Sequence, residues 1–153
     1  RRHPMAKVFI YPTTSMILSD LVKRFGHEPL GSALAIRERI QTAGFESPPL
    51  QITPEEPKKG LHWAAVEVPS GVRGRMAILG PQIDAADAAV IISQADYAFG
   101  CMGCARTNEL LIYLLKTKGI PVLDLVYPTT DEEGIAFVAA IRKFLSSLGG
   151  GAA

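Results

Sequence analysis

The chain has 153 residues, the length of one ordinary domain, which is enough to bury a sizeable core. Hydrophobic residues make up 48% and charged residues 20%, a balance typical of folded globular proteins and not of disordered ones. The formal net charge of +1 gives no argument for nucleic acid or a membrane surface as a partner. We expect a cytoplasmic protein, because no stretch reads as a membrane span or as a secretory leader.

The first half of the chain predicts a strand at residues 7–11, KVFIY, followed by a helix in SMILSDLVKRFG. A second helix is expected over residues 30–44. Residues 46–60 carry four prolines and predict an extended segment without regular helix. A strand is expected at residues 62–68, HWAAVEV, then the loop PSGVRGR and a short helix that is broken near Gly80 and Pro81.

The second half alternates more regularly between apolar strands and amphipathic helices. Strands are expected at residues 88–93 and 121–127, with a helix from residue 104 to about 118 between them. The last helix is expected to carry one apolar face. Its members are Ile135, Val138, Ile141, Leu145 and Leu148.

This alternation predicts the α/β class: a single three-layer domain, Rossmann-like or flavodoxin-like, with a small, mostly parallel four-stranded sheet. We place the domain at residues 6–148 and expect flexible ends at residues 1–5 and 149–153. A strand order of 2-1-3-4 would reverse direction between the first and third strands, where such sheets bind ligands at the carboxyl edge. The loops that would meet there are YPTTS, after the first strand, and SQADYAFGCMGC, after the third.

The string YPTT occurs twice, at residues 11–14 and 127–130, each time between a strand and a helix. In the second copy Thr130 and Glu133 predict a capping box, which satisfies that helix start internally. The first copy continues SMIL, without a carboxylate, so its N–H groups and three hydroxyls could receive an external phosphate or carboxylate. The hydroxyls belong to Thr13, Thr14 and Ser15. The alternative is that Thr14 or Ser15 only caps the helix.

Both cysteines of the chain, Cys101 and Cys104, lie in one glycine-rich turn, FGCMGCARTNEL. A C-x-x-C pair at a helix start favours a reactive thiolate, and Arg106 adds positive charge. The same spacing suits zinc or an iron–sulfur cluster, whose other ligands would come from a second subunit, a partner protein or an external group. The alternative is a pair of inert cysteines that fill a turn. Asn108 follows the pair and could bind a polar ligand group.

The segment EVPSGVRGRMA, residues 67–77, predicts an anion-binding loop. Ser70, Arg73 and Arg75 lie among glycines, where a guanidinium can hold a carboxylate or phosphate by two hydrogen bonds. The segment lacks the lysine of a P-loop and the spacing of a dinucleotide fingerprint, so neither ATP nor NAD is indicated. The alternative is a solvated turn.

Four motifs occur in order along the chain: KVFIYPTTSMILSDLVKRFGHEPL, VEVPSGVRGRMAILGP, FGCMGCARTNEL and KGIPVLDLVYPTT. Together they resemble the methanogenesis marker proteins, specifically the fifth numbered family of that archaeal set, over nearly all of residues 5–148. The resemblance implies a cytoplasmic protein of methanogenic archaea without an assigned reaction. The set is associated with assembly, modification, cofactor supply or reductive activation of methyl-coenzyme M reductase.

Three functions fit these residues. We expect an accessory protein that assists assembly, cofactor maturation or reductive activation of methyl-coenzyme M reductase, with Cys101 and Cys104 as catalytic thiols or metal ligands. Its partners would be that reductase or its maturation factors, with formation of homo-oligomers as a further alternative. The first alternative is a binding protein or enzyme for a small phosphate or carboxylate. The second is a non-catalytic scaffold.

Overall fold

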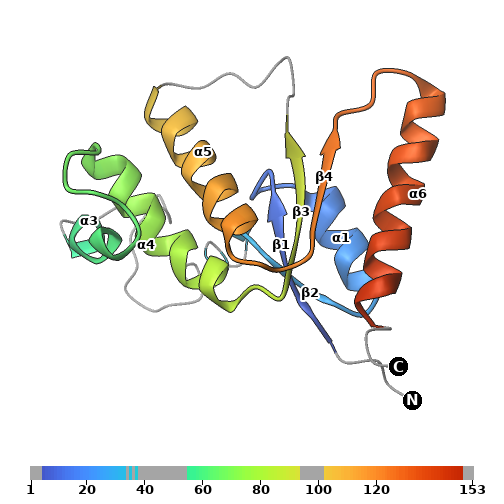
Figure 1. Cartoon of the computed structure of the whole chain (residues 1–153), viewed down its shortest axis with the longest axis horizontal. Helices are drawn as coiled ribbons and strands as arrows, with labels where there is room; N and C mark the ends of the chain where they lie inside the picture. Colours follow the sequence, from blue (N-terminus) through green and yellow to red (C-terminus); the bar gives the residue numbers. More distant parts are fainter. Residues whose placement is uncertain (1–4, 34, 36, 38–54, 94–101, 150–153) are drawn as a thin grey trace.

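The computed structural model of the chain describes residues 5–33, 35, 37, 55–93 and 102–149. Four parallel strands form one sheet in the order β2-β1-β3-β4. Helices cover both faces of this sheet, as Figure 1 shows. The α/β class and the small parallel sheet expected from the sequence are confirmed.

Strands and helices alternate along the chain. The strands are β1 (Lys7–Tyr11), β2 (Glu28–Leu30), β3 (Ala88–Ser93) and β4 (Val122–Val126). The helices are α1 (Met16–Arg24), α3 (Glu55–Lys59), the 3-10 turn η1 (Gly60–His62), α4 (Ser70–Ala85), α5 (Met102–Thr117) and α6 (Asp131–Leu148). Three of the strands, β1, β3 and β4, and the helices α1, α5 and α6 lie where the sequence predicts them.

Two hydrophobic cores lie on opposite faces of the sheet. Side chains alternate between the faces of a strand, so neighbouring residues enter different cores. Phe9 and Ile91 pack against α4 and α5 on one face, and Ile10 and Val90 pack against α1 and α6 on the other. The five residues of β3 from 88 to 92 are all buried, as expected of an inner strand covered on both faces.

The strand expected at residues 62–68 is wrong. Ala64 and Val68 pack against the core, but Val66 between them is 64% exposed, whereas a strand would place all three on one face. The second strand is instead β2, whose three residues are too few for a periodic pattern to indicate. It accommodates Pro29 because it lies at the edge of the sheet, where a missing N–H is tolerated.

Two expectations based on prolines are also wrong. Pro57 lies in the first turn of α3, where its missing N–H has no helical partner to lose. The helix α4 is not broken near Gly80 and Pro81 but continues through Pro81 to its last residue, Ala85. Gly80 is buried against Trp63, and a Cβ at that position would lie 2.3 Å from the indole ring.

The apolar face expected for the last helix is correct only in its C-terminal half. Ile141 and Leu145 are buried, but Ile135 is 73% exposed and Val138 is 51% exposed. Phe137 packs against the core in their place. The segment from 135 to 141 is apolar around the whole helix, so spacing alone does not indicate which side is buried.

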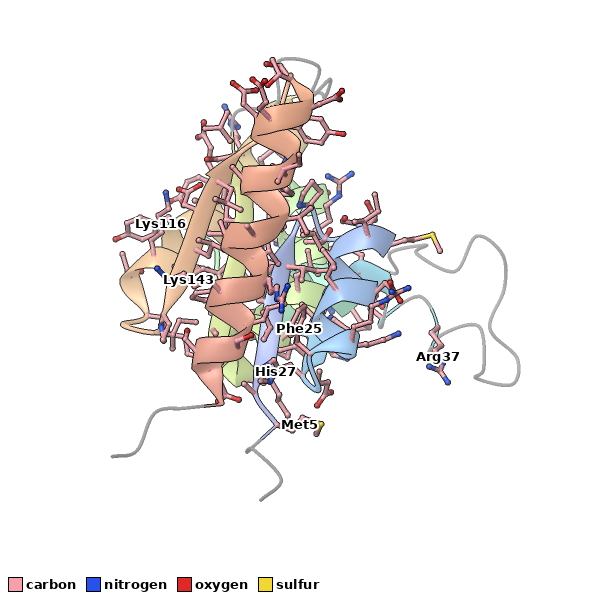
Figure 2. The ribbon with its side chains drawn as sticks, turned by 90° about the vertical axis from the view of Figure 1, so that its right-hand side faces the viewer. Met5, Phe25, His27, Arg37, Lys116 and Lys143 are labelled. Carbon is pink, nitrogen blue, oxygen red and sulfur yellow. The ribbon has the colours of Figure 1, made fainter. Side chains whose placement is uncertain are left out.

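His27 joins α6 to the start of the sheet (Figure 2). Its Nε2–H donates to the carbonyl oxygen of Leu145 at 2.9 Å, and its Nδ1 accepts the backbone N–H of Ala6 at 3.2 Å. The imidazole is buried, with both nitrogens hydrogen-bonded. It therefore has a structural role.

Some expectations lie outside the described residues. They concern the chain ends at 1–4 and 150–153 and the segment 46–54. Of the helix expected over residues 30–44, only residues 32, 33, 35 and 37 are described as helical.

Candidate functional site

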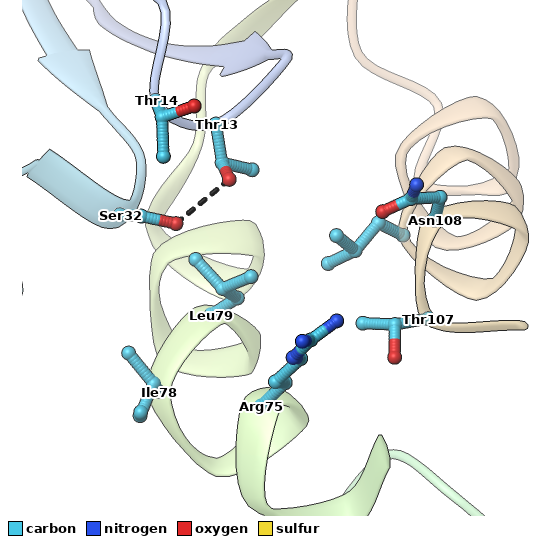
Figure 3. Close-up of a pocket in the computed structure, with 9 residues that line it drawn as sticks. Thr13, Thr14, Ser32, Arg75, Ile78, Leu79, Thr107 and Asn108 are labelled. Carbon is cyan, nitrogen blue, oxygen red and sulfur yellow. Dashed lines mark hydrogen bonds between the residues drawn. The ribbon is translucent and has the colours of Figure 1, made fainter. Parts of the chain in front are cut away.

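Hydrogen bonds join the loop that follows β1 to the loop that follows β2. The backbone N–H of Ser32 donates to the carbonyl oxygen of Thr13 at 2.8 Å, and its hydroxyl donates to the Thr13 hydroxyl at 2.7 Å (Figure 3). Gly31 permits this approach, because a Cβ there would lie 2.7 Å from the Thr13 carbonyl oxygen. The Gly31 N–H donates to the side chain of Gln82 on α4 at 2.6 Å. Thr13 is thus held in place by the fold.

A cavity of about 370 Å³ opens beside these loops. Its lining residues are Thr13, Thr14, Ser32, Arg75, Ile78, Leu79, Thr107, Asn108 and Leu111. They come from the β1 and β2 loops, α4 and α5. The cavity lies at the carboxyl edge of the sheet, where the connection from β1 leads to β2 and that from β3 leads the other way to β4. Parallel α/β sheets bind their ligands at this switch point.

The cavity combines one cationic side chain with hydroxyl, amide and apolar groups, among the described residues that line it. Arg75 projects into it from α4, and Asn108 points into it from α5 (Figure 3). Ile78 and Leu79 add apolar surface. A guanidinium beside neutral donors suits an anion, and the apolar wall suits a ligand with a short hydrocarbon part.

Tyr11, at the end of β1, forms a hydrogen bond with the side chain of Asn108. Burial raises the pKa of the Tyr11 phenol, and a hydrogen bond with the Asn108 side chain acts in the opposite direction with smaller effect. The phenol is therefore neutral at physiological pH. Its contact with Asn108 links the last residue of β1 to a cavity-lining residue of α5.

Four side chains predicted to bind an anion or ligand are brought together at this cavity: those of Thr13, Thr14, Arg75 and Asn108. Ser15 is not among the lining residues. It is the N-cap of α1, and its Oγ accepts the backbone N–H of Leu18 at 3.2 Å. For this hydroxyl the capping alternative is correct.

The arginine loop is wrong as a loop, because α4 begins at Ser70 and includes Arg73 and Arg75 in its first turns. Two residues apart in a helix, the arginines point in nearly opposite directions. Arg73 does not line the cavity. Its Nε donates to the Val68 carbonyl at 3.3 Å and its Nη1 to the Pro57 carbonyl at 3.4 Å. Ser70 is exposed and does not line the cavity.

Arg106 is exposed on α5 and is also absent from the cavity lining. The residues that sequence reasoning missed are Ser32, Ile78, Leu79, Thr107 and Leu111. Ser32 could not be placed because the strand before it was not recognised. Thr107 is 2% exposed, and its adjacency to Asn108 was the one signal in the sequence that could have included it.

The cysteine turn lies largely outside the described residues: this holds for Cys101 and for the side chain of Cys104. The backbone of Cys104 belongs to the first turn of α5, one turn before Thr107 and Asn108. Within the described part of the chain, no three His, Cys, Asp or Glu side chains are grouped so that they could hold a metal ion. The described helices include none that is long and apolar enough to cross a bilayer.

The second YPTT copy holds a carboxylate of the chain itself. Glu133 Oε2 accepts the backbone N–H of Thr129 at 2.7 Å, the Thr129 hydroxyl at 2.9 Å and the backbone N–H of Thr130 at 3.2 Å. These bonds, first those from Thr129 and then that from Thr130, hold the pKa of Glu133 below its usual value. The Glu133 N–H donates back to the Thr130 hydroxyl at 3.2 Å, so the predicted capping box is confirmed.

The fold is a parallel α/β domain with a cavity of about 370 Å³ at its topological switch point. The chain belongs to the archaeal family described as "uncharacterized protein conserved in archaea (DUF2112)", whose sequence profile matches residues 6–148. It is similar to an uncharacterized protein of Methanocaldococcus jannaschii, at 56% identity over 144 residues, covering 94% of this chain and 96% of the relative. No solved structure shows a significant match.

Proposed function

We propose that this protein binds a small anionic molecule in the cavity between the β1 loop, α4 and α5. The observation that carries the proposal is that Thr13, Thr14, Arg75 and Asn108, from three separate segments, converge on one 370 Å³ cavity at the switch point. A cavity of this size fits a metabolite and not a polymer.

The surroundings of the cavity support this role. The hydrogen bonds from Ser32 to Thr13, and the one between Tyr11 and Asn108, hold two polar side chains before a ligand arrives. A preorganised site loses less conformational entropy on binding and so binds more tightly. Arg75 supplies the positive charge that an anion requires.

The test is a thermal-shift screen of phosphorylated and carboxylated metabolites, followed by calorimetric titration of the anions that raise the melting temperature. We expect Arg75→Gln to weaken binding of the anion with the highest affinity about tenfold or more, because it removes a charge-assisted hydrogen bond. Arg106→Gln, which removes an exposed arginine outside the cavity, is the matched control and leaves affinity unchanged. Absence of any shift across the screen, or equal affinity in both variants, contradicts the proposal.

A second candidate function adds thiol chemistry beside the same cavity. We propose, from the resemblance to the fifth methanogenesis marker family, a cytoplasmic accessory protein that assists methyl-coenzyme M reductase or its maturation factors. The backbone of Cys104 lies one turn before two cavity-lining residues of α5, which supports a role for this residue near the cavity. Any zinc or iron–sulfur cluster on Cys101 and Cys104 would need further ligands from a partner or a second copy.

Metal analysis and thiol titration of anaerobically purified protein test this second candidate. We expect reactive thiols or bound metal that Cys101→Ser and Cys104→Ser both abolish, with anion binding at the cavity preserved. Inert thiols without metal, in the protein alone and with the reductase added, contradict it.

A further inference from the structure

The two YPTT copies occupy corresponding places in the fold. Each begins at the carboxyl end of a parallel strand, β1 or β4, and each leads into a helix, α1 or α6. In the second copy, two backbone N–H groups and one threonine hydroxyl converge on one oxygen of the Glu133 carboxylate. The second copy therefore shows that the threonines of a YPTT segment can bind a carboxylate.

The first copy has the same four residues, but no carboxylate stands four residues after its first threonine. Ile17 stands four residues after Thr13, as Glu133 stands four residues after Thr129, and the Ile17 side chain is 74% exposed. The helix cap has also moved by one position, from the second threonine of the motif to Ser15. Thr14 is therefore not used as the cap and lines the cavity beside Thr13.

The Thr13 hydroxyl remains able to donate. It accepts a hydrogen bond from Ser32, which leaves its own proton for a further acceptor. In the second copy the corresponding hydroxyl, on Thr129, donates to a carboxylate oxygen. The first loop thus offers a ligand carboxylate the same kind of donor.

Arg75 provides a second anion-binding point on another side of the cavity from Thr13 and Thr14 (Figure 3). The side chains of Ile78 and Leu79 line the cavity as well. A ligand that satisfies both points has an acidic group at each end and a short apolar chain between them.

Resting on the proposed function, we infer that the ligand class is a short-chain dicarboxylate. One carboxylate accepts a hydrogen bond from the Thr13 hydroxyl at the Thr13–Thr14 loop, and the other binds the Arg75 guanidinium. The apolar chain of the ligand lies along α4.

Calorimetric titration of the full chain with glutarate, butyrate and inorganic phosphate tests this inference. We expect glutarate to bind about tenfold or more tightly than butyrate, and phosphate to bind most weakly. Arg75→Gln removes the advantage of glutarate over butyrate, because only the second carboxylate contacts Arg75. Thr13→Val weakens both carboxylates about tenfold, since both use the threonine loop.

Thr129→Val is the matched control, because it makes the same change in the other YPTT copy, outside the cavity. It leaves the affinity for glutarate unchanged. Phosphate binding as tightly as glutarate, or a glutarate preference that persists in Arg75→Gln, overturns the dicarboxylate inference while anion binding stands. Absence of binding by every anion overturns the proposed function as well.

Discussion

Gly80 and Trp63 meet where α4 passes over the segment that follows η1. The indole ring lies so close to the helix that a Cβ on Gly80 would approach its ring atoms to 2.3 Å. The Trp63 Nε1–H donates to the Asp84 carboxylate at 3.1 Å, which fixes the ring one turn further along. This contact accounts for the glycine in the helix interior.

We therefore expect Gly80→Ala to destabilise the protein by about 1–3 kcal/mol, because the added methyl group overpacks the site. In an open helix the same change is favourable, since alanine has the higher helix propensity. Gly71, in the first turn of α4, is the matched control, because a methyl group added there would meet no packing neighbour within 4 Å. Urea unfolding should show Gly71→Ala neutral or stabilising by up to about 1 kcal/mol. Equal stabilisation by both substitutions contradicts this account of Gly80.

The two arginines of α4 show what residue-level sequence reasoning could predict. The composition of the segment indicated an anion-binding site, and Arg75 does line the cavity. The segment was expected to be a loop, however, in which both arginines could face one ligand. Helical phase separates them, and Arg73 instead holds the carbonyl groups of Val68 and Pro57. Local sequence indicates the chemistry of a side chain better than its direction.

At the scale of elements, the helix starts were the most predictable features. The capping box at Thr130 and Glu133 is confirmed, because its hydrogen bonds join residues only three apart in sequence. The sequence allows Ser15 either to bind a ligand or to cap α1, and in the structure it is the N-cap of α1. Such local contacts can be recognised without knowledge of the fold.

The strands were predictable where they are long and apolar. The inner strand β3 reads as a buried run, and β1 and β4 have β-branched residues with clear ends. β2 is short and contains Pro29, so its strand conformation depends on pairing with β1 and not on local preference. Residues 62–68 have the composition of a strand, but Ala64 and Val68 pack against the core that contains α4 while Val66 between them is exposed.

At the scale of the whole molecule, the expected order 2-1-3-4 matches the observed order of the sheet, although the second strand is a different segment. The order was sufficient to predict that the first threonine turn lies at the switch point. The positions of α4 and of the loop after β2 at the cavity depend on contacts between segments that are distant in sequence. One example is the hydrogen bond from the Gly31 N–H to the Gln82 side chain. Only the structure could reveal them.

The central claim is that an anion binds in the cavity between the β1 loop, α4 and α5. The most direct test of it is a map of backbone-amide chemical shifts as the full chain is titrated with glutarate. The cavity predicts the largest changes at Thr13, Thr14, Ser32 and Asn108, with Thr129 at the other YPTT copy unaffected. Changes centred on the start of α6, or no changes at any amide, would contradict it.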